Sequence, residues 1–149
     1  MGKRRFKAIA AAVILLLAAI QFIPAGDRNP VVDPSRTIYA TEPVPTGVRT
    51  ILESSCKNCH SNETNWPWYS YIAPISWVVG RDVRQGRSHM NFSEWAGYSP
   101  QKREEKLEEI CEQIMNGDMP DGKYTLVHRN ARLTEPQRAA VCEWTEAVR

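Results

Sequence analysis

Apolar residues recur at three- and four-residue spacings in four separate stretches of the chain, which is the pattern of amphipathic helices. The stretches begin near Thr46, Pro74, Ser99 and Thr134. Their apolar stripes are Val48, Ile51 and Leu52; Ile75, Val78, Val79 and Val83; Leu107, Ile110, Cys111 and Ile114; and Val141, Trp144 and Val148. Because no segment shows a convincing strand alternation, we predict an all-α domain.

Start and stop signals bound the last two of these helices. Ser99 is a capping residue, and Gly117 provides a stop. Thr134 with Gln137 three residues later forms the pattern of a capping box. Residues 124–131 between these helices are expected to be irregular.

The N-terminus has a different pattern. A basic run, Lys3-Arg4-Arg5-Phe6-Lys7, precedes residues 8–23, which are apolar apart from Gln21. This is typical of a signal peptide or of an uncleaved signal-anchor, and the lack of a clean A-x-A site favours a retained membrane helix within residues 1–25. The basic end is then cytoplasmic. We therefore expect the domain in the bacterial cell envelope, on the periplasmic side of the inner membrane, or soluble there if the helix is cleaved.

A proline-rich stretch follows. Residues 26–45 contain four prolines and little apolar periodicity, which predicts an extended linker. The folded domain is then expected over residues 46–149.

The charge of the exported part argues against one class of function. The net charge of +2 includes four basic and no acidic residues within residues 1–25, which leaves 15 basic and 17 acidic residues beyond them. A near-neutral domain offers no basic field for nucleic acid, so we exclude nucleic-acid binding.

The strongest chemical signal is Cys56-Lys57-Asn58-Cys59-His60. A C-x-x-C-H run holds haem c through two thioether bonds, from Cys56 and Cys59, and supplies an axial iron ligand, His60. Half of a zinc site, a thioredoxin-like redox pair and a short structural disulfide are the alternatives. No second ligand pair suits zinc, and no βαβ pattern suits a redox pair, so haem is favoured.

The other axial position has several candidates. Met119 lies in a loop bounded by glycine and proline, where a core methionine is less expected, and it is preferred. His89 is the main alternative, followed by His128, Met90 and an open site. The aromatic residues of the loop after the motif either wall the cofactor or serve as core for a small domain. They include Trp66, Trp68 and Tyr69.

The motif and the downstream Gly-Asp-Met-Pro segment resemble class I cytochrome c. More closely, CKNCHSNETNWPWYSYIAPISW, GRSHMNFSEW and GDMPDGKYTLVHRNARLT resemble the small exported haem-binding domain family of bacterial cytochrome-c-like proteins. The resemblance implies the cytochrome c helical fold around one covalent haem, with His60 proximal and Met119 distal. In the segment that begins at His89, a histidine binds iron or hydrogen-bonds a propionate.

Cys111 and Cys142 depart from what a simple cytochrome c needs. Each lies on or beside the apolar stripe of its helix, and spare thiols in an exported protein often pair. We predict a Cys111–Cys142 disulfide, against the alternative of two buried free cysteines.

These features together predict a membrane-tethered c-type cytochrome that carries single electrons between redox protein partners, and they favour an electron-transfer protein over an enzyme. One alternative is a haem-based sensor or peroxidase-like enzyme with an open or displaceable sixth ligand. Another is a thiol–disulfide oxidoreductase that uses Cys56 and Cys59. The last is a binding module with a structural haem, which presents the loop of residues 66–71 to a partner.

Overall fold

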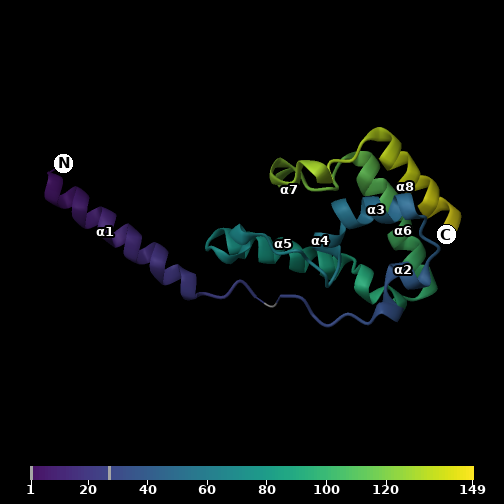
Figure 1. The fold of residues 1–149 in the computed structure, drawn as a ribbon, viewed down its shortest axis with the longest axis horizontal. Coiled ribbons are helices and arrows are strands. Elements are labelled where there is room, and N and C mark those ends of the chain that lie inside the picture. Colours follow the sequence, from purple (N-terminus) through teal and green to yellow (C-terminus); the bar gives the residue numbers. More distant parts are fainter. Residues whose placement is uncertain (1, 27) are drawn as a thin grey trace.

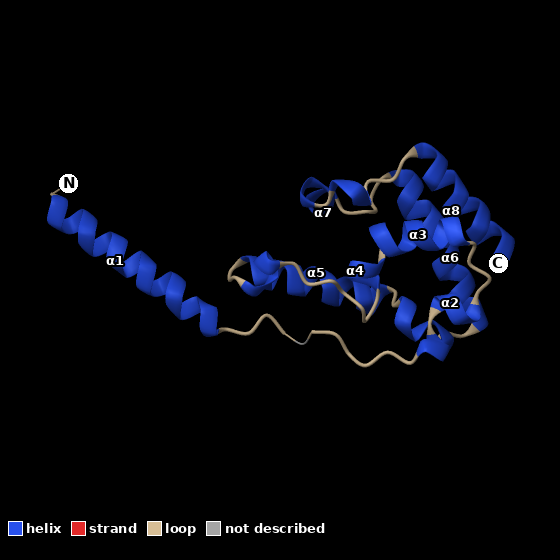
Figure 2. Cartoon of the chain, viewed as in Figure 1, coloured by secondary structure: helices blue, strands red, loops and turns tan. Residues whose placement is uncertain are grey.

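The computed structural model describes residues 2–26 and 28–149, and it contains only helices and loops over these residues (Figures 1 and 2). A long N-terminal helix stands apart from the folded part of the chain, in which one cluster of buried apolar residues forms the core. The all-α prediction is confirmed for the described residues.

The core is built from α3 (Thr46–Ser55), α6 (Pro100–Asn116), α8 (Glu135–Val148) and the 3-10 helix η4 (Phe92–Gly97). The predicted stripes of α3, α6 and α8 supply much of it, because each helix turns its apolar side to the others. The cluster consists of Ile38, Val48, Ile51, Leu52, Met90, Phe92, Trp95, Leu107, Ile110, Ile114, Leu133, Val141 and Trp144. Burial of each large apolar side chain contributes roughly 1.5–3 kcal/mol.

The predicted helix boundaries of α6 and α8 are confirmed. The Ser99 hydroxyl accepts a hydrogen bond from the Lys102 amide at 3.2 Å. Gly117 ends α6 with a φ of +79°, in the left-handed region that glycine enters without a Cβ penalty. The backbone amide of Thr134 donates to the Gln137 side chain at 2.9 Å, which completes the capping box.

A helix forms where irregular chain was expected. The segment beyond Met119 contains α7 (Gly122–Val127) and the short 3-10 helix η5 (Arg129–Ala131). The Asp121 carboxylate caps α7, because it accepts hydrogen bonds from the amides of Lys123 and Tyr124 at 2.7 and 3.2 Å. The Asp121 cap marks the start of α7 in the sequence, although the apolar residues of this segment show no helical periodicity.

The disulfide prediction is also confirmed. Cys111 of α6 and Cys142 of α8 are bonded, with their Cα atoms 4.9 Å apart. The bridge closes a loop with a sequence separation of 31 residues and joins the two longest helices of the core. Cys56 and Cys59 remain free thiols.

The N-terminal helix α1 (Lys3–Ala19) continues into η1 (Ile20–Phe22) and has no buried residue. Its length and apolar composition suit a membrane anchor or a signal sequence. Residues 28–33 then run as extended chain, as predicted for the linker.

The extended stretch is shorter than predicted. Instead of extended chain up to Pro45, the structure has η2 (Pro34–Arg36) and α2 (Ile38–Thr41), and Ile38 is completely buried. The two residues after α2 are hydrogen-bonded to buried tryptophans. Trp95 Nε1 donates to the Glu42 carboxylate at 2.8 Å. Trp144 Nε1 donates to the Pro43 carbonyl at 3.2 Å. The physical reason is tertiary: these contacts come from residues far along the chain.

The predicted apolar stripe of α5 (Ile75–His89) is buried only in part. Ile75 and Val78 are 49% and 45% exposed, whereas Ser76 and Gly80 are buried together with Val83. The helix buries small residues because backbone atoms of other segments approach it closely on that side, and the prediction for Ile75 and Val78 was wrong for this reason.

Candidate functional site

The C-x-x-C-H run forms a single helical turn. This turn, α4 (Lys57–His60), follows α3 directly, and Cys56 lies at the junction. The backbone amides of Cys59 and His60 both donate to the Cys56 carbonyl, at 3.1 and 3.0 Å. The two thiols and the imidazole are therefore held on one compact turn.

Helix α5 supports this turn at one glycine. A Cβ on Gly86 would lie 2.5 Å from the Cys59 carbonyl oxygen and 3.1 Å from its Cβ. Any larger residue would push α4 away from α5, because real Cβ atoms do not come so close to a backbone oxygen.

The imidazole of His60 is buried and oriented. Its Nδ1 lies 3.2 Å from the Met90 carbonyl, and only 8% of the residue is exposed. A carbonyl can only accept, so Nδ1 carries the hydrogen and the Nε2 lone pair is free. Burial lowers the pKa of His60, which favours this neutral form. A neutral imidazole with one nitrogen held by a hydrogen bond is the arrangement of a metal-binding histidine.

A buried polar network fixes the segments on both sides of that hydrogen bond. The backbone amide of Asn62 donates to the Ser93 hydroxyl at 3.0 Å, and the side-chain amide of Asn91 donates to the side-chain oxygen of Asn62 at 2.8 Å. All three residues are less than 9% exposed. The network ties the residues after His60 to those after Met90, so the imidazole and its carbonyl partner keep their relative positions.

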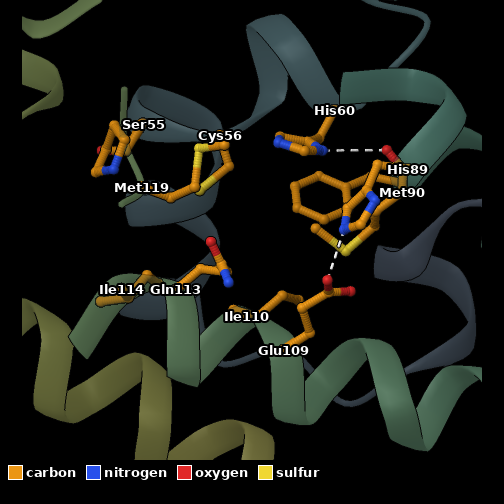
Figure 3. A pocket seen from close by; sticks show the side chains of 12 residues that line it. Ser55, Cys56, His60, His89, Met90, Glu109, Ile110, Gln113, Ile114 and Met119 are labelled. Atoms are coloured by element: carbon orange, nitrogen blue, oxygen red, sulfur yellow. Dashed lines mark hydrogen bonds and ion pairs between the residues drawn. The ribbon is translucent and has the colours of Figure 1, made fainter. Parts of the chain in front are cut away.

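His60 faces a largely apolar pocket between the motif and α6 (Figure 3). Four of the five predicted iron ligands line this one pocket: His60, Met119, His89 and Met90. Cys56 lines it as well. The other lining residues are Ser55, Phe92, Glu109, Ile110, Gln113, Ile114 and Pro120. The tertiary structure thus brings the motif together with a methionine about sixty positions further along the chain.

The alternative histidines differ from His60 in their surroundings. His89 Nε2 is 2.6 Å from the Glu109 carboxylate across the pocket, and the His89 side chain is 60% exposed. The backbone carbonyl of His89 accepts a hydrogen bond from the buried Lys106 ammonium. His128 lies outside the pocket, stacked on Tyr124 with ring centroids 4.3 Å apart.

The structure places the aromatic loop elsewhere. Trp66, Trp68 and Tyr69 were candidates for either a wall of the cofactor site or the core, and none of them lines the pocket that holds His60 or belongs to the core cluster. Trp68 is 75% exposed, and Tyr69 is hydrogen-bonded to His128 at 2.6 Å. Phe92 is the aromatic residue of the pocket instead, with its ring centroid 6.2 Å from that of His60.

Sequence reasoning missed Phe92 as well as two further residues at the site. Because Gly86 has no side chain, the backbone of the C-x-x-C-H turn can pack closely against α5. Arg87 fixes the residue that follows the motif, since its guanidinium donates to the Ser61 carbonyl at 2.7 Å. Arg87 also donates to the Arg28 carbonyl at 2.8 Å, so it joins the linker to the site. A glycine and an arginine inside a helical pattern carry no signal of such contacts.

The two free thiols are not activated nucleophiles. Burial raises the pKa of Cys56 from an ordinary 9.0 to about 12 and that of Cys59 to about 11. Catalytic redox cysteines have lowered pKa values instead, because the thiolate is the reactive form. These raised pKa values argue against thiol–disulfide exchange by Cys56 and Cys59 at neutral pH.

These residues fit a haem. A neutral buried imidazole, two free thiols on the same turn and an apolar pocket with a thioether define the class as helical haem-binding proteins. The family model of the haem-binding domain matches residues 15–147, nearly the whole chain. The chain therefore belongs to the haem-binding domain family, and it is a haem protein. No curated protein and no solved structure matches it.

Proposed function

We propose that this protein is a membrane-tethered c-type cytochrome that carries single electrons on the outer side of a bacterial inner membrane. The observation that carries the proposal is the buried His60, whose Nδ1 is engaged by Met90 and whose Nε2 is left for a metal, on the same turn as two free thiols.

In this proposal Cys56 and Cys59 hold one haem through thioether bonds, His60 is the proximal ligand and Met119 the distal ligand. Met119 is favoured over His89 because the His89 imidazole is already hydrogen-bonded to Glu109. Met90 orients His60 through its backbone carbonyl, and its side chain lines the pocket without binding iron in this proposal.

Haem supplies one-electron redox chemistry at its iron when it is bound. The chain holds the imidazole in one orientation, excludes water with Phe92, Ile110 and Ile114, and provides a thioether that raises the potential. No side chain is required to make or break substrate bonds, so an electron carrier is preferred to an enzyme.

The location follows from the N-terminal helix. Four basic residues precede its apolar part, which favours a cytoplasmic N-terminus and a periplasmic domain. C-type haem attachment on the outer side of the membrane, which the family resemblance implies, agrees with that orientation. The electron donor and acceptor are redox proteins that reach the domain from the periplasm or along the membrane.

One observation keeps a second function in consideration. Met119 is 39% exposed and lies on the loop between α6 and α7, so an external ligand has access to the position it occupies. A sensor or peroxidase-like enzyme would use a displaceable Met119. Such a protein would bind carbon monoxide readily when reduced.

The test is an absorption spectrum of the oxidised and reduced full chain, expressed with a c-haem maturation system, followed by a haem-stained denaturing gel. We expect haem to stay on the chain through denaturation and the oxidised form to show the weak far-red methionine–iron band. Covalent haem without that band would overturn Met119 as the ligand. The absence of covalent haem would overturn the proposal.

Matched variants assign the ligand. Met119→Ala should abolish the far-red band and lower the potential, whereas His89→Ala should leave the band in place. A wild-type chain that lacks the band, with a spectrum that changes in His89→Ala but not in Met119→Ala, would make His89 the distal ligand. Met90→Leu, which keeps the orienting carbonyl, is the control for a methionine that lines the same pocket.

A further inference from the structure

An exposed apolar surface lies at the end of the folded domain nearest to α1 (Figure 1). It is formed by the 3-10 helix η3 (Trp68–Tyr71) and the first turn of α5. The patch consists of Trp68 (75% exposed), Tyr71 (62%), Ile72 (44%), Ile75 (49%) and Val78 (45%). We call these five residues the η3–α5 patch. Isolated apolar residues on a surface need no partner, but a group of neighbouring ones marks an interaction site.

This patch is fastened to the end of the N-terminal helix. The Gln21 side chain makes a pair of hydrogen bonds with the backbone of Ala73: it donates to the carbonyl at 3.2 Å and accepts from the amide at 3.0 Å. Trp77 Nε1 donates to the Ile23 carbonyl at 3.2 Å. The patch is therefore held beside the point where the apolar run of α1 ends.

Two arginines hold the next part of the linker against the same surface. The Arg28 guanidinium lies 4.5 Å from the Trp66 ring centroid and 4.1 Å from that of Tyr71. Arg84 donates to the Ala25 carbonyl at 2.6 Å. These contacts limit the freedom of the domain relative to α1, which a flexible tether would not do.

Acidic residues are absent from the patch itself. Residues 64–81 contain no aspartate or glutamate, and Arg81 at the end of that range pairs with Asp82 at 2.9 Å. The surface thus combines exposed Trp and Tyr with aliphatic residues and nearby arginines. This is the composition of protein surfaces at the boundary between lipid headgroups and hydrocarbon.

We infer that the η3–α5 patch lies in the outer headgroup region of the bilayer that α1 spans and docks the domain on that membrane. The inference rests on the proposed retention of α1. The occupant is lipid, because the patch is continuous with the end of a helix, Lys3–Phe22, that is long and apolar enough to cross a membrane. Lipid then covers Ile75 and Val78, which the fold of the chain leaves uncovered.

This docking sets the position of the haem pocket. The N-terminal end of α5 carries part of the patch, and its C-terminal end carries His89, which lines the pocket with the adjoining Met90. With 15 residues, α5 holds the two ends about 22 Å apart. The pocket is consequently kept away from the lipid surface, where a periplasmic redox partner has access to it.

The test places the photo-crosslinking amino acid benzoylphenylalanine at single positions of the full chain. Suitable positions are Trp68 and Ile75, with Ala147 as the control, because Ala147 is exposed on α8, at the far end of the domain from α1 (Figure 1). The haem-loaded chains are reconstituted in phosphatidylcholine–phosphatidylglycerol vesicles and irradiated. Intact-mass spectrometry then reports lipid adducts, haem and the N-terminal helix in one measurement.

We expect lipid adducts at Trp68 and Ile75 to exceed those at Ala147 several-fold. Adducts to a second protein chain, or equal lipid labelling at all three positions, would overturn the inference, as would a mass that lacks the N-terminal helix. A chain without covalent haem that still shows position-specific lipid adducts would refute the proposed cytochrome function but leave the docking surface in place.

Discussion

Removal of the Cys111–Cys142 disulfide should strongly destabilise the domain. The bridge closes a loop with a sequence separation of 31 residues between α6 and α8. In the chain-entropy model, a loop of that length lowers the entropy of the unfolded chain by about 12 cal/mol/K, which corresponds to about 3.7 kcal/mol at 25 °C. Many domains have a total stability of about 5–15 kcal/mol, so the loss would be a large fraction of it.

The assay is urea unfolding of the full chain in detergent at 25 °C, followed by far-ultraviolet circular dichroism. The oxidised chain is compared with the same chain after phosphine reduction, which leaves thioether bonds intact. With a slope of about 1–3 kcal/mol/M, a loss of 3.7 kcal/mol moves the midpoint down by about 1–4 M.

The double variant Cys111→Ala/Cys142→Ala separates the cross-link from the packing of the two half-buried side chains. It should unfold near the midpoint of the reduced chain. Coincident curves for the oxidised and reduced chains would refute the entropic argument, and a loss confined to the variant would assign the effect to packing.

Three further predictions concern the site and its supports. Gly86→Ala should lower the free energy of unfolding by about 1–3 kcal/mol and reduce haem incorporation, because the added Cβ meets the Cys59 carbonyl. Gly47→Ala is the control: an added Cβ has open space there, so this change in α3 should raise the free energy of unfolding by about 0.5–1 kcal/mol in the same urea assay. Arg87→Met should cost about 1–3 kcal/mol, since it leaves the carbonyls of the buried Ser61 and the half-buried Arg28 without a donor, while the exposed Arg81→Met should have little effect. In the haem-free chain, iodoacetamide should alkylate Cys59 at pH 8 about 100-fold more slowly than an ordinary thiol, because burial raises its pKa from 9.0 to about 11, and the rate should climb as the pH approaches that value. Rapid alkylation at pH 7 would instead favour the oxidoreductase interpretation.

The sequence by itself determined the features that depend on near neighbours in the chain. The C-x-x-C-H turn, the caps at Ser99 and Thr134 and the stop at Gly117 all follow from residues within one helical turn of each other. The helical class follows from periodicity for the same reason. The pairing of Cys111 with Cys142 was also accessible, since only two cysteines were left once the motif was set aside.

Only the tertiary structure decided which faces meet. The apolar stripe of α5 predicted burial of Ile75 and Val78, yet Ser76 and Gly80 are buried in their place, together with Val83, and another backbone segment approaches Gly80 closely. The same holds for the cofactor wall. Phe92 lines the pocket and the aromatic loop does not, and the carbonyl that orients His60 comes from a residue thirty positions away in sequence. Such contacts depend on the three-dimensional path of the backbone, which local periodicity does not encode.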